Sequence, residues 1–271
     1  MAANSEDLLS QCYWPDLPAR YATALREAAH FILERCPDTR GIVVSGTILR
    51  GNPAPSSDLD IYVIRRELQR QRVQKFFNGV PAEIFINPAE KVPDYFADEA
   101  REARPITAHM LGTGFVILDR DGVIADLQAR ARHILQTPPA PSAATLTTAR
   151  YMAAARYEDA TDIATTRPET ARMILGQAVH EMVCYHFLAD HRFVPRDKDL
   201  LEILKTRDAA LGALVRRFYG AATIAEALSL AEQIADRTIE TRGFFEWEST
   251  PETVTASYPC VVTTSVVPKG D

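Results

Sequence analysis

The first part of the chain contains a stretch whose apolar residues recur at helical spacing. Within 18–35 they share one face and are Tyr21, Leu25, Ala28, Ile32 and Leu33. Polar and charged residues occupy most of the other positions. The pattern predicts a helix over 18–35 that packs one face against a core.

Short apolar runs bounded by turn residues follow this helix. They are Ile42–Ser45, Leu59–Ile64, Ala82–Ile86 and Gly114–Leu118. Runs of this length are typical of strands, and the last is closed by residues 119–122, Asp-Arg-Asp-Gly, which indicate a turn. Four strands mixed with helices predict an α/β (α+β) fold built on a small mixed sheet.

The pattern changes after a proline-rich segment. Residues 137–142, TPPAPS, cannot continue a helix, because proline lacks the amide donor and clashes with the preceding turn. We interpret them as a linker. We therefore predict a sheet domain over 1–138, a second domain over 139–245 and a C-terminal arm or tail over 246–271.

The second domain is predicted to be an all-helical bundle. Apolar residues recur at helical spacing over 144–164, 168–190, 198–218 and 223–242. Thr166 and Glu169 have the spacing of a capping box at the start of the second of these helices. The last stretch, Thr250 to Asp271, is rich in Thr, Val, Ser and Pro, which fits either a loose tail or an arm on a partner subunit.

Charge and composition narrow the classes of partner. The 30 Lys and Arg residues against 36 Asp and Glu give a net charge of −6, which disfavours nucleic acid and anionic lipid as ligands. The chain begins without a basic apolar signal and has no apolar run near the roughly 20 residues that span a bilayer. Cys12, Cys36, Cys184 and Cys260 show no metal-binding or redox spacing. We expect a cytoplasmic protein that binds small ligands.

Candidate chemistry begins at the end of the first predicted strand. Ser45, Gly46 and Thr47 follow an apolar run there. Glycine lets a backbone approach a ligand, and the two small hydroxyls can bind it. If a helix starts at this turn, its free amides favour a phosphate.

Two carboxylates stand at the start of the next strand. Asp58 and Asp60 bracket Leu59, and alternate residues of a strand face the same way. Two acids on one face repel unless a cation lies between them, and hard divalent ions prefer carboxylate and phosphate oxygens. The alternative is a turn at Asp58 and a solvated edge residue at Asp60.

A third acid, Glu83, lies among Ala82, Ile84, Phe85 and Ile86. An acid in such a run is costly to bury unless it is paired or bound to a metal. With Asp58 and Asp60 on a neighbouring strand, Glu83 completes a triad that can bind a metal and take the proton of an attacking hydroxyl. The alternative is an edge-strand residue that points to solvent.

This order of residues resembles the nucleotidyltransferase superfamily typified by DNA polymerase β. The shared pattern is an apolar strand, Gly-Ser or Gly-Thr, an acid-x-acid strand and a later strand with a third acid, over roughly residues 20–125 here. The resemblance implies a metal triad of Asp58, Asp60 and Glu83. It also implies that Ser45, Gly46 and Thr47 hold the nucleotide phosphates, with Arg50 and Ser57 supporting the loop or touching the triphosphate.

A sheet domain followed by a helical bundle is most similar to the aminoglycoside and related small-molecule nucleotidyltransferases. In those enzymes a Lys and a Tyr of the helical domain reach the triphosphate, so Lys198 and Tyr219 are candidates; the alternatives are a solvated lysine and a packed tyrosine. The resemblance implies two Mg²⁺ ions, ATP or another NTP as co-substrate, and a hydroxylated small-molecule acceptor. It also implies a monomer or homodimer. The alternative function is a regulatory module that acts on a protein partner, or a nucleotide sensor.

Other polar groups are interpreted as structural. Asp119 and Asp121 form a second acid-x-acid, but Gly122 follows and indicates a turn. His180 and His186 fall on different faces of a helix and cannot chelate one metal. His186 and Asp190 share a helix face, but no other feature of the sequence supports a functional role for the pair. The basic stretch Arg65, Arg66, Arg70, Arg72 and Lys75 is predicted to be a solvated helix face.

Overall fold

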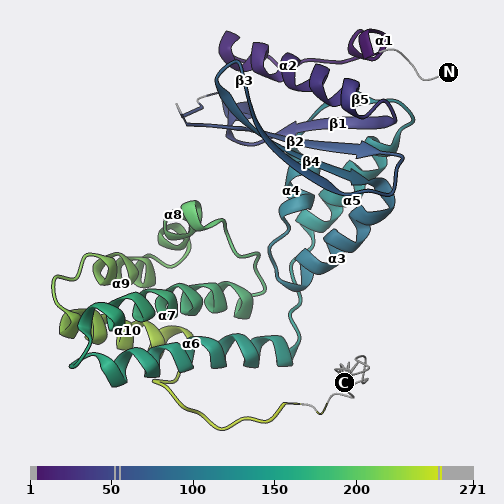
Figure 1. Ribbon diagram of the computed structural model, residues 1–271. Coiled ribbons are helices and arrows are strands. Elements are labelled where there is room, and N and C mark those ends of the chain that lie inside the picture. Colours follow the sequence, from purple (N-terminus) through teal and green to yellow (C-terminus); the bar gives the residue numbers. More distant parts are fainter. Residues whose placement is uncertain (1–4, 52, 55, 250, 252–271) are drawn as a thin grey trace, which may run out of the picture.

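A computed structural model describes residues 5–51, 53–54, 56–249 and 251. Its N-terminal part is a five-stranded sheet in the order β3-β4-β2-β1-β5 (Figure 1). The strands are β1 (Thr39–Ser45), β2 (Leu59–Arg65), β3 (Gln71–Phe77), β4 (Val80–Pro88) and β5 (Phe115–Asp119). Strands β2 and β4 are parallel, and the other neighbouring pairs are antiparallel. The predicted mixed sheet is confirmed.

Helices cover both faces of the sheet. On one face lies α2 (Ala19–Arg35), which packs its apolar stripe on Ile42, Ile61 and Ile84. On the other face lie α3 (Val92–Arg101), α4 (Ile106–Thr113) and α5 (Val123–Gln136), against Val43 and Tyr62. The short α1 (Ser5–Leu9), η1 (Thr47–Arg50) and η2 (Ala89–Lys91) complete this part. Both predicted features of α2, its extent and its buried stripe, are confirmed.

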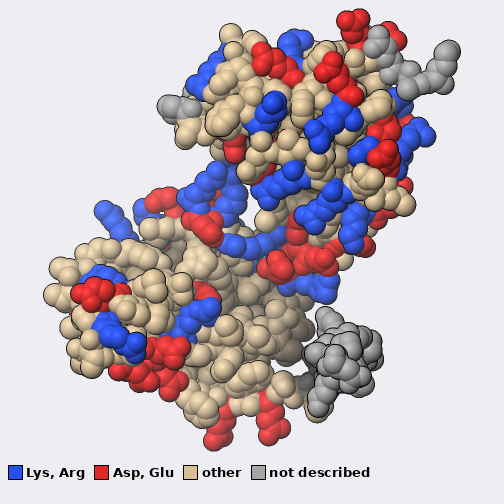
Figure 2. Space-filling model, in the orientation of Figure 1, with Lys and Arg blue, Asp and Glu red and all other residues tan. Residues whose placement is uncertain are grey.

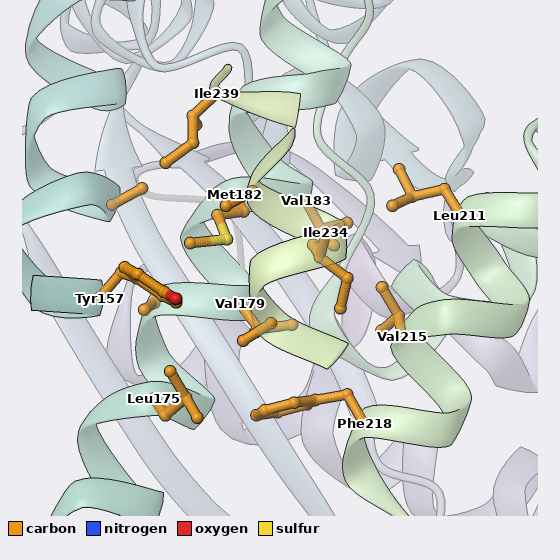
Figure 3. Close-up of a cluster of buried hydrophobic side chains, with 14 of the residues drawn as sticks. Tyr157, Leu175, Val179, Met182, Val183, Leu211, Val215, Phe218, Ile234 and Ile239 are labelled. Atoms are coloured by element: carbon orange, nitrogen blue, oxygen red, sulfur yellow. The ribbon is translucent and has the colours of Figure 1, made fainter. Parts of the chain in front are cut away.

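The C-terminal part is all-helical, as predicted. Its helices are α6 (Ala143–Ile163), α7 (Pro168–Ala189), α8 (Asp197–Arg207), α9 (Ala209–Tyr219) and α10 (Ile224–Thr238). Side chains from all five helices converge on one apolar core, which includes Tyr157, Val179, Val215 and Ile234 (Figure 3). Burying a large apolar side chain contributes roughly 1.5–3 kcal/mol, so this core stabilises the bundle.

Among the described residues, no helix combines the length and apolar character needed to cross a membrane.

The basic stretch was predicted wrongly. Arg72 and Lys75 lie on β3, an edge strand, and not on a helix face. Most residues of β3 are exposed; Val73 is half-buried and Phe77 is buried. An edge strand with few buried side chains has no clear apolar alternation, so its sequence carries no strand signal.

Two details of the helical part also differ from expectation. The single helix expected over 198–218 is two helices separated at Asp208, whose carboxylate accepts a hydrogen bond from the amide of Leu211 (2.8 Å) and caps α9. The capping box at Thr166 is absent: Arg167 is the N-cap of α7 and makes no side-chain cap, while Thr166 donates back to the carbonyl of Ile163. Pro168 in the first turn removes one amide that would need a cap.

Helix α5 ends at Gln136 and α6 begins at Ala143, so the proline-rich segment joins the sheet part to the helical part. A second connection is the loop between α3 and α4. Ala103 of that loop is buried in the helical core, and its carbonyl accepts a hydrogen bond from the amide of Val194 (2.9 Å). The helical part is therefore anchored to the sheet part away from the linker. Of the predicted C-terminal arm or tail over 246–271, only residues 246–249 and 251 are among those that the structure describes.

Candidate functional site

A polar row crosses the sheet where β2 and β4 begin and β1 ends. In the strand register, Asp60 is opposite Ser45 on one side and Glu83 on the other, and Glu83 is opposite Gln74 of β3. Opposed residues of neighbouring strands face the same way. The row lies on the face that α3, α4 and α5 cover further along the same strands. The register thus places Asp60 and Glu83 side by side, although they are far apart in the sequence.

The turn after β1 lies directly against this row. Gly46 has φ +100°, and a Cβ there would lie 2.8 Å from Oδ2 of Asp60. Only glycine combines this backbone conformation with such a close approach. The helix considered at this turn is present only as η1, a four-residue 3₁₀ helix. Thr47 and the buried Ser57 share a hydrogen bond between hydroxyls (3.2 Å), which ties the turn to the start of β2.

Negative charge accumulates around Asp60. Its burial, and then the charges of Asp58 and Glu83, raise its pKa to about 6. Lys198 and Arg196, from the helical part, lower it. Ser45 is 4% exposed, and its hydroxyl has no hydrogen-bond partner among the described residues. Crowded carboxylates beside an unpartnered buried hydroxyl are a donor set that suits a hard divalent cation and its phosphate ligands.

Glu83 is engaged by the edge strand. Its Oε1 forms an ion pair with Arg72 (2.6 Å) and accepts a hydrogen bond from the side-chain amide, Nε2, of Gln74. Across the residues that the structure describes, no three His, Cys, Asp or Glu side chains lie close enough together to hold a metal ion. Asp58 and Glu83 are near enough to raise the pKa of Asp60, but the three acids are not gathered into a triad, and their metal-binding role stays a prediction.

The helical part brings positive charge towards the carboxylates. Lys198 and Arg196 stand at the start of α8, and Figure 1 shows α8 as the helix of this part nearest the sheet. Lys and Arg side chains from both parts border the hollow between the two lobes in Figure 2. Asp197 accepts from Arg104 of the α3–α4 loop (2.5 Å) and lies 3.3 Å from His180 of α7. This contact fixes the start of α8 between the two parts.

Arg50 and His109 also belong to this region. Arg50 is exposed at the end of η1. Partial burial, and then the charges of Arg196 and Arg50, lower the pKa of His109 on α4. Sequence reasoning missed Arg196, His109, Arg72 and Gln74. Arg196 was visible as the second cation beside Lys198, but the others become neighbours of the site only through the fold.

Tyr219 is not brought to the carboxylates. Its hydroxyl donates to the carbonyl of Gly176 on α7 (3.2 Å), and its ring packs on Phe218. Gly176 and His180 line a polar pocket of about 400 Å³ with Arg156, Met173, Gln177 and Glu181. Tyr219 therefore lies near this pocket through its contact with Gly176, which is one helical turn from His180.

The groups interpreted as structural have local partners. Asp121 forms an ion pair with Arg40 (2.8 Å) beside the turn after β5. Asp190 pairs with Arg192, and His186 packs edge-on against Phe187. These contacts agree with the structural interpretation of the second acid-x-acid and of His186.

Comparison with known proteins supports the fold. No protein-family model matches the chain, and no curated protein matches it. Among solved structures, the chain is similar to the crystal structure of a nucleotidyltransferase-like protein from Exiguobacterium sibiricum 255-15. The TM-score is 0.51 and the sequence identity 15%, over 79% of this chain and 74% of that one. Together with the mixed sheet and the helical C-terminal part, this similarity shows that the chain has a nucleotidyltransferase-like fold.

Proposed function

We propose that this protein is a magnesium-dependent nucleotidyltransferase that transfers a nucleoside monophosphate, AMP from ATP, to a hydroxyl of a small molecule. The observation that carries the proposal is the position of Asp60. It is crowded by two carboxylates, lies against the glycine turn, and faces cations of the helical part. A site of this kind suits a metal-bound triphosphate, whose charge needs both cations and close backbone approach.

The proposed reaction is a single displacement. The acceptor oxygen forms a bond to the α-phosphorus, the bond from that phosphorus to the bridging oxygen of the β-phosphate breaks, and pyrophosphate leaves. The hydroxyl proton passes to a carboxylate, for which Glu83 is our assignment. Because Glu83 is paired with Arg72, it must be released before it can take this role.

Each site residue has an assigned part. Asp58, Asp60 and Glu83 would hold two Mg²⁺ ions, which, when bound, neutralise phosphate charge and favour loss of the acceptor proton. Ser45, Gly46 and Thr47 would bind phosphate oxygens, with Arg50 and Ser57 supporting the turn. Lys198, and with it Arg196, would meet the triphosphate from α8. Tyr219 stays a candidate contact for the bound substrates.

The acceptor class rests on the helical part. The pocket of about 400 Å³ beside His180 is lined by Gln177, Arg156 and Glu181, with Arg156 and Glu181 paired at 3.0 Å. Amide, imidazole and carboxylate groups can each hydrogen-bond a hydroxyl. His180, which lines the pocket, contacts Asp197, the residue before Lys198. The polar lining and this position near Lys198 support a hydroxylated acceptor.

The test is transfer of label from α-labelled ATP with Mg²⁺, using aminoglycosides, other hydroxylated small molecules and cell-extract proteins as acceptors. Asp60→Asn should lower transfer at least about 100-fold while the protein stays folded. Asp94→Asn, an exposed acid paired with Lys91, is the matched control and should keep its activity. Full activity in Asp60→Asn would overturn the assignment. Label on a protein band would instead support the regulatory function.

A further inference from the structure

The side chains that hold Glu83 come from the strand on the other side of β4 from Asp60. Strand β4 lies between β2, which carries Asp60, and β3, which carries Arg72 and Gln74. Both contacts of the Glu83 carboxylate run to β3. The Oε1 of Glu83 therefore points toward β3 at the edge of the sheet. Asp58 and Asp60 lie at the start of β2, on the other side of β4.

The strand register explains why these three side chains meet. Gln74 is the direct partner of Glu83, and Arg72 is opposite Phe85, two residues further along β4 on the same face. Direct and diagonal neighbours on one face of an antiparallel pair are within reach of long side chains. The contact follows from the backbone and needs no special loop.

Arg72 is placed so that its ion pair with Glu83 can break. Its side chain is 58% exposed, whereas that of Glu83 is 20% exposed. Its guanidinium also lies over the ring of Phe85, 4.8 Å from the centroid. Because this cation–π contact does not involve Glu83, it can hold the Arg72 side chain after the ion pair breaks. An ion pair with one exposed partner is weak enough to be exchanged for a divalent cation.

We propose that Arg72 and Gln74 are positioning residues that compete with the metal for Glu83 and release it when the magnesium nucleotide binds. This inference rests on the proposed function. Because coupling between two binding events is reciprocal, a contact that opposes metal binding is itself weakened by the metal. The prediction is that loss of Arg72 strengthens metal binding in the absence of nucleotide.

The experiment measures Mn²⁺ binding to the full chain without nucleotide, from the electron paramagnetic resonance signal of free Mn²⁺. Arg72→Gln should bind Mn²⁺ about threefold to tenfold more tightly than the unsubstituted protein. Arg72→Lys, which keeps the charge, should stay close to it. Lys75→Gln is the matched control, because it removes one charge from the same strand on the opposite face, where Lys75 lies over Phe31.

A double substitution separates the proposed route from a general change of charge. If Arg72 acts through Glu83, Arg72→Gln should have no effect in a Glu83→Gln background. A gain that persists there, or an Arg72→Gln protein that binds no more tightly, overturns the inference. Thermal unfolding of each variant checks that it is folded; should Arg72→Gln not fold, Gln74→Ala, which removes the other contact, should give a smaller gain in its place.

The same measurement distinguishes this inference from the proposed function. Asp60→Asn should weaken Mn²⁺ binding whatever stands at position 72. If Asp60→Asn leaves binding unchanged, the proposed metal site fails and the inference with it. If Asp60→Asn weakens binding and Arg72→Gln changes nothing, only the role of Arg72 is lost.

Discussion

Gly46 lies against the carboxylate of Asp60, so closely that a Cβ at position 46 would be 2.8 Å from Oδ2. The contact joins the end of β1 to the start of β2 at the level where Ser45 and Asp60 are register partners. The turn and the acid are thereby fixed relative to one another by the sheet itself.

We expect Gly46→Ala to lose both stability and transfer activity. Its φ of +100° costs a residue with a Cβ about 1–3 kcal/mol, and the clash with Asp60 adds to this. Gly51→Ala is the control, since its φ of +89° is also unfavourable but its Cβ would meet no described atom within 4 Å. Urea unfolding and the labelled-ATP assay measure the two effects. Equal losses in the two variants would contradict the close contact.

The raised pKa of Asp60 predicts a pH dependence of stability in the metal-free protein. The pKa rises from the ordinary 3.8 to about 6 in the folded state, so between these values the folded protein keeps a proton that the unfolded chain releases. The stability due to protonated Asp60 is full below pH 4 and is lost as the pH rises through 6. Allowing for the partial exposure of Asp60, we expect a loss of about 1–2 kcal/mol.

Asp60→Asn should remove this dependence. The variant should be at least as stable as the unsubstituted protein at pH 7 although its transfer activity is strongly lowered, as expected for an acid whose role is functional and not structural. Urea unfolding between pH 4 and 7 in the presence of a chelator measures it. A variant that is less stable at pH 7 would show that Asp60 is a structural acid.

The contact between Arg104 and Asp197 should affect nucleotide binding more than stability. It holds the start of α8, which carries Lys198, to the loop before α4. Because Asp197 is largely exposed, Arg104→Gln should cost at most about 1 kcal/mol. We expect the KM for ATP to rise several-fold, about threefold to tenfold, with a smaller change in kcat. Arg101→Gln, which breaks a local pair with Asp98 on α3, should change neither constant.

Lys198 itself should contribute directly to triphosphate binding. Lys198→Gln removes a charge that acts on Asp60, so the KM for ATP should rise by about tenfold. Lys205→Gln, on the same helix, removes a charge that is paired with Glu202 (3.0 Å) and should leave the KM unchanged. Steady-state kinetics with saturating acceptor measures both, and a similar KM in the two variants would argue against a role for Lys198.

The helix ends give a prediction about stability alone. Asp208→Ala removes the side-chain cap of α9 and should lower the free energy of unfolding by about 1 kcal/mol. Thr166→Ala should cost much less, because Thr166 caps no helix and only donates to the carbonyl of Ile163. Thermal unfolding of the two variants compares them. A larger loss of stability in Thr166→Ala would show that Thr166 does cap α7, as the capping-box spacing in the sequence indicates.

Local pattern carried much of the sequence prediction. The helical stripe of α2 and the apolar runs of β1, β2, β4 and β5 are visible because each element buries its own side chains. The edge strand β3 buries too few side chains to show a pattern, and the division between α8 and α9 at Asp208 is hidden because α9 begins at the next residue.

The sequence by itself determined the order of the candidate site: a glycine turn at Gly46, paired acids at Asp58 and Asp60, and a third acid at Glu83. What only the tertiary structure decided is which groups meet. The register of β2 with β4 sets Asp60 beside Glu83, β3 supplies Arg72, and the docking of Val194 on Ala103 brings Lys198 to the acids. These neighbours depend on contacts between distant segments, because strand pairing and helix docking are set by the packing of the whole core and not by any local repeat.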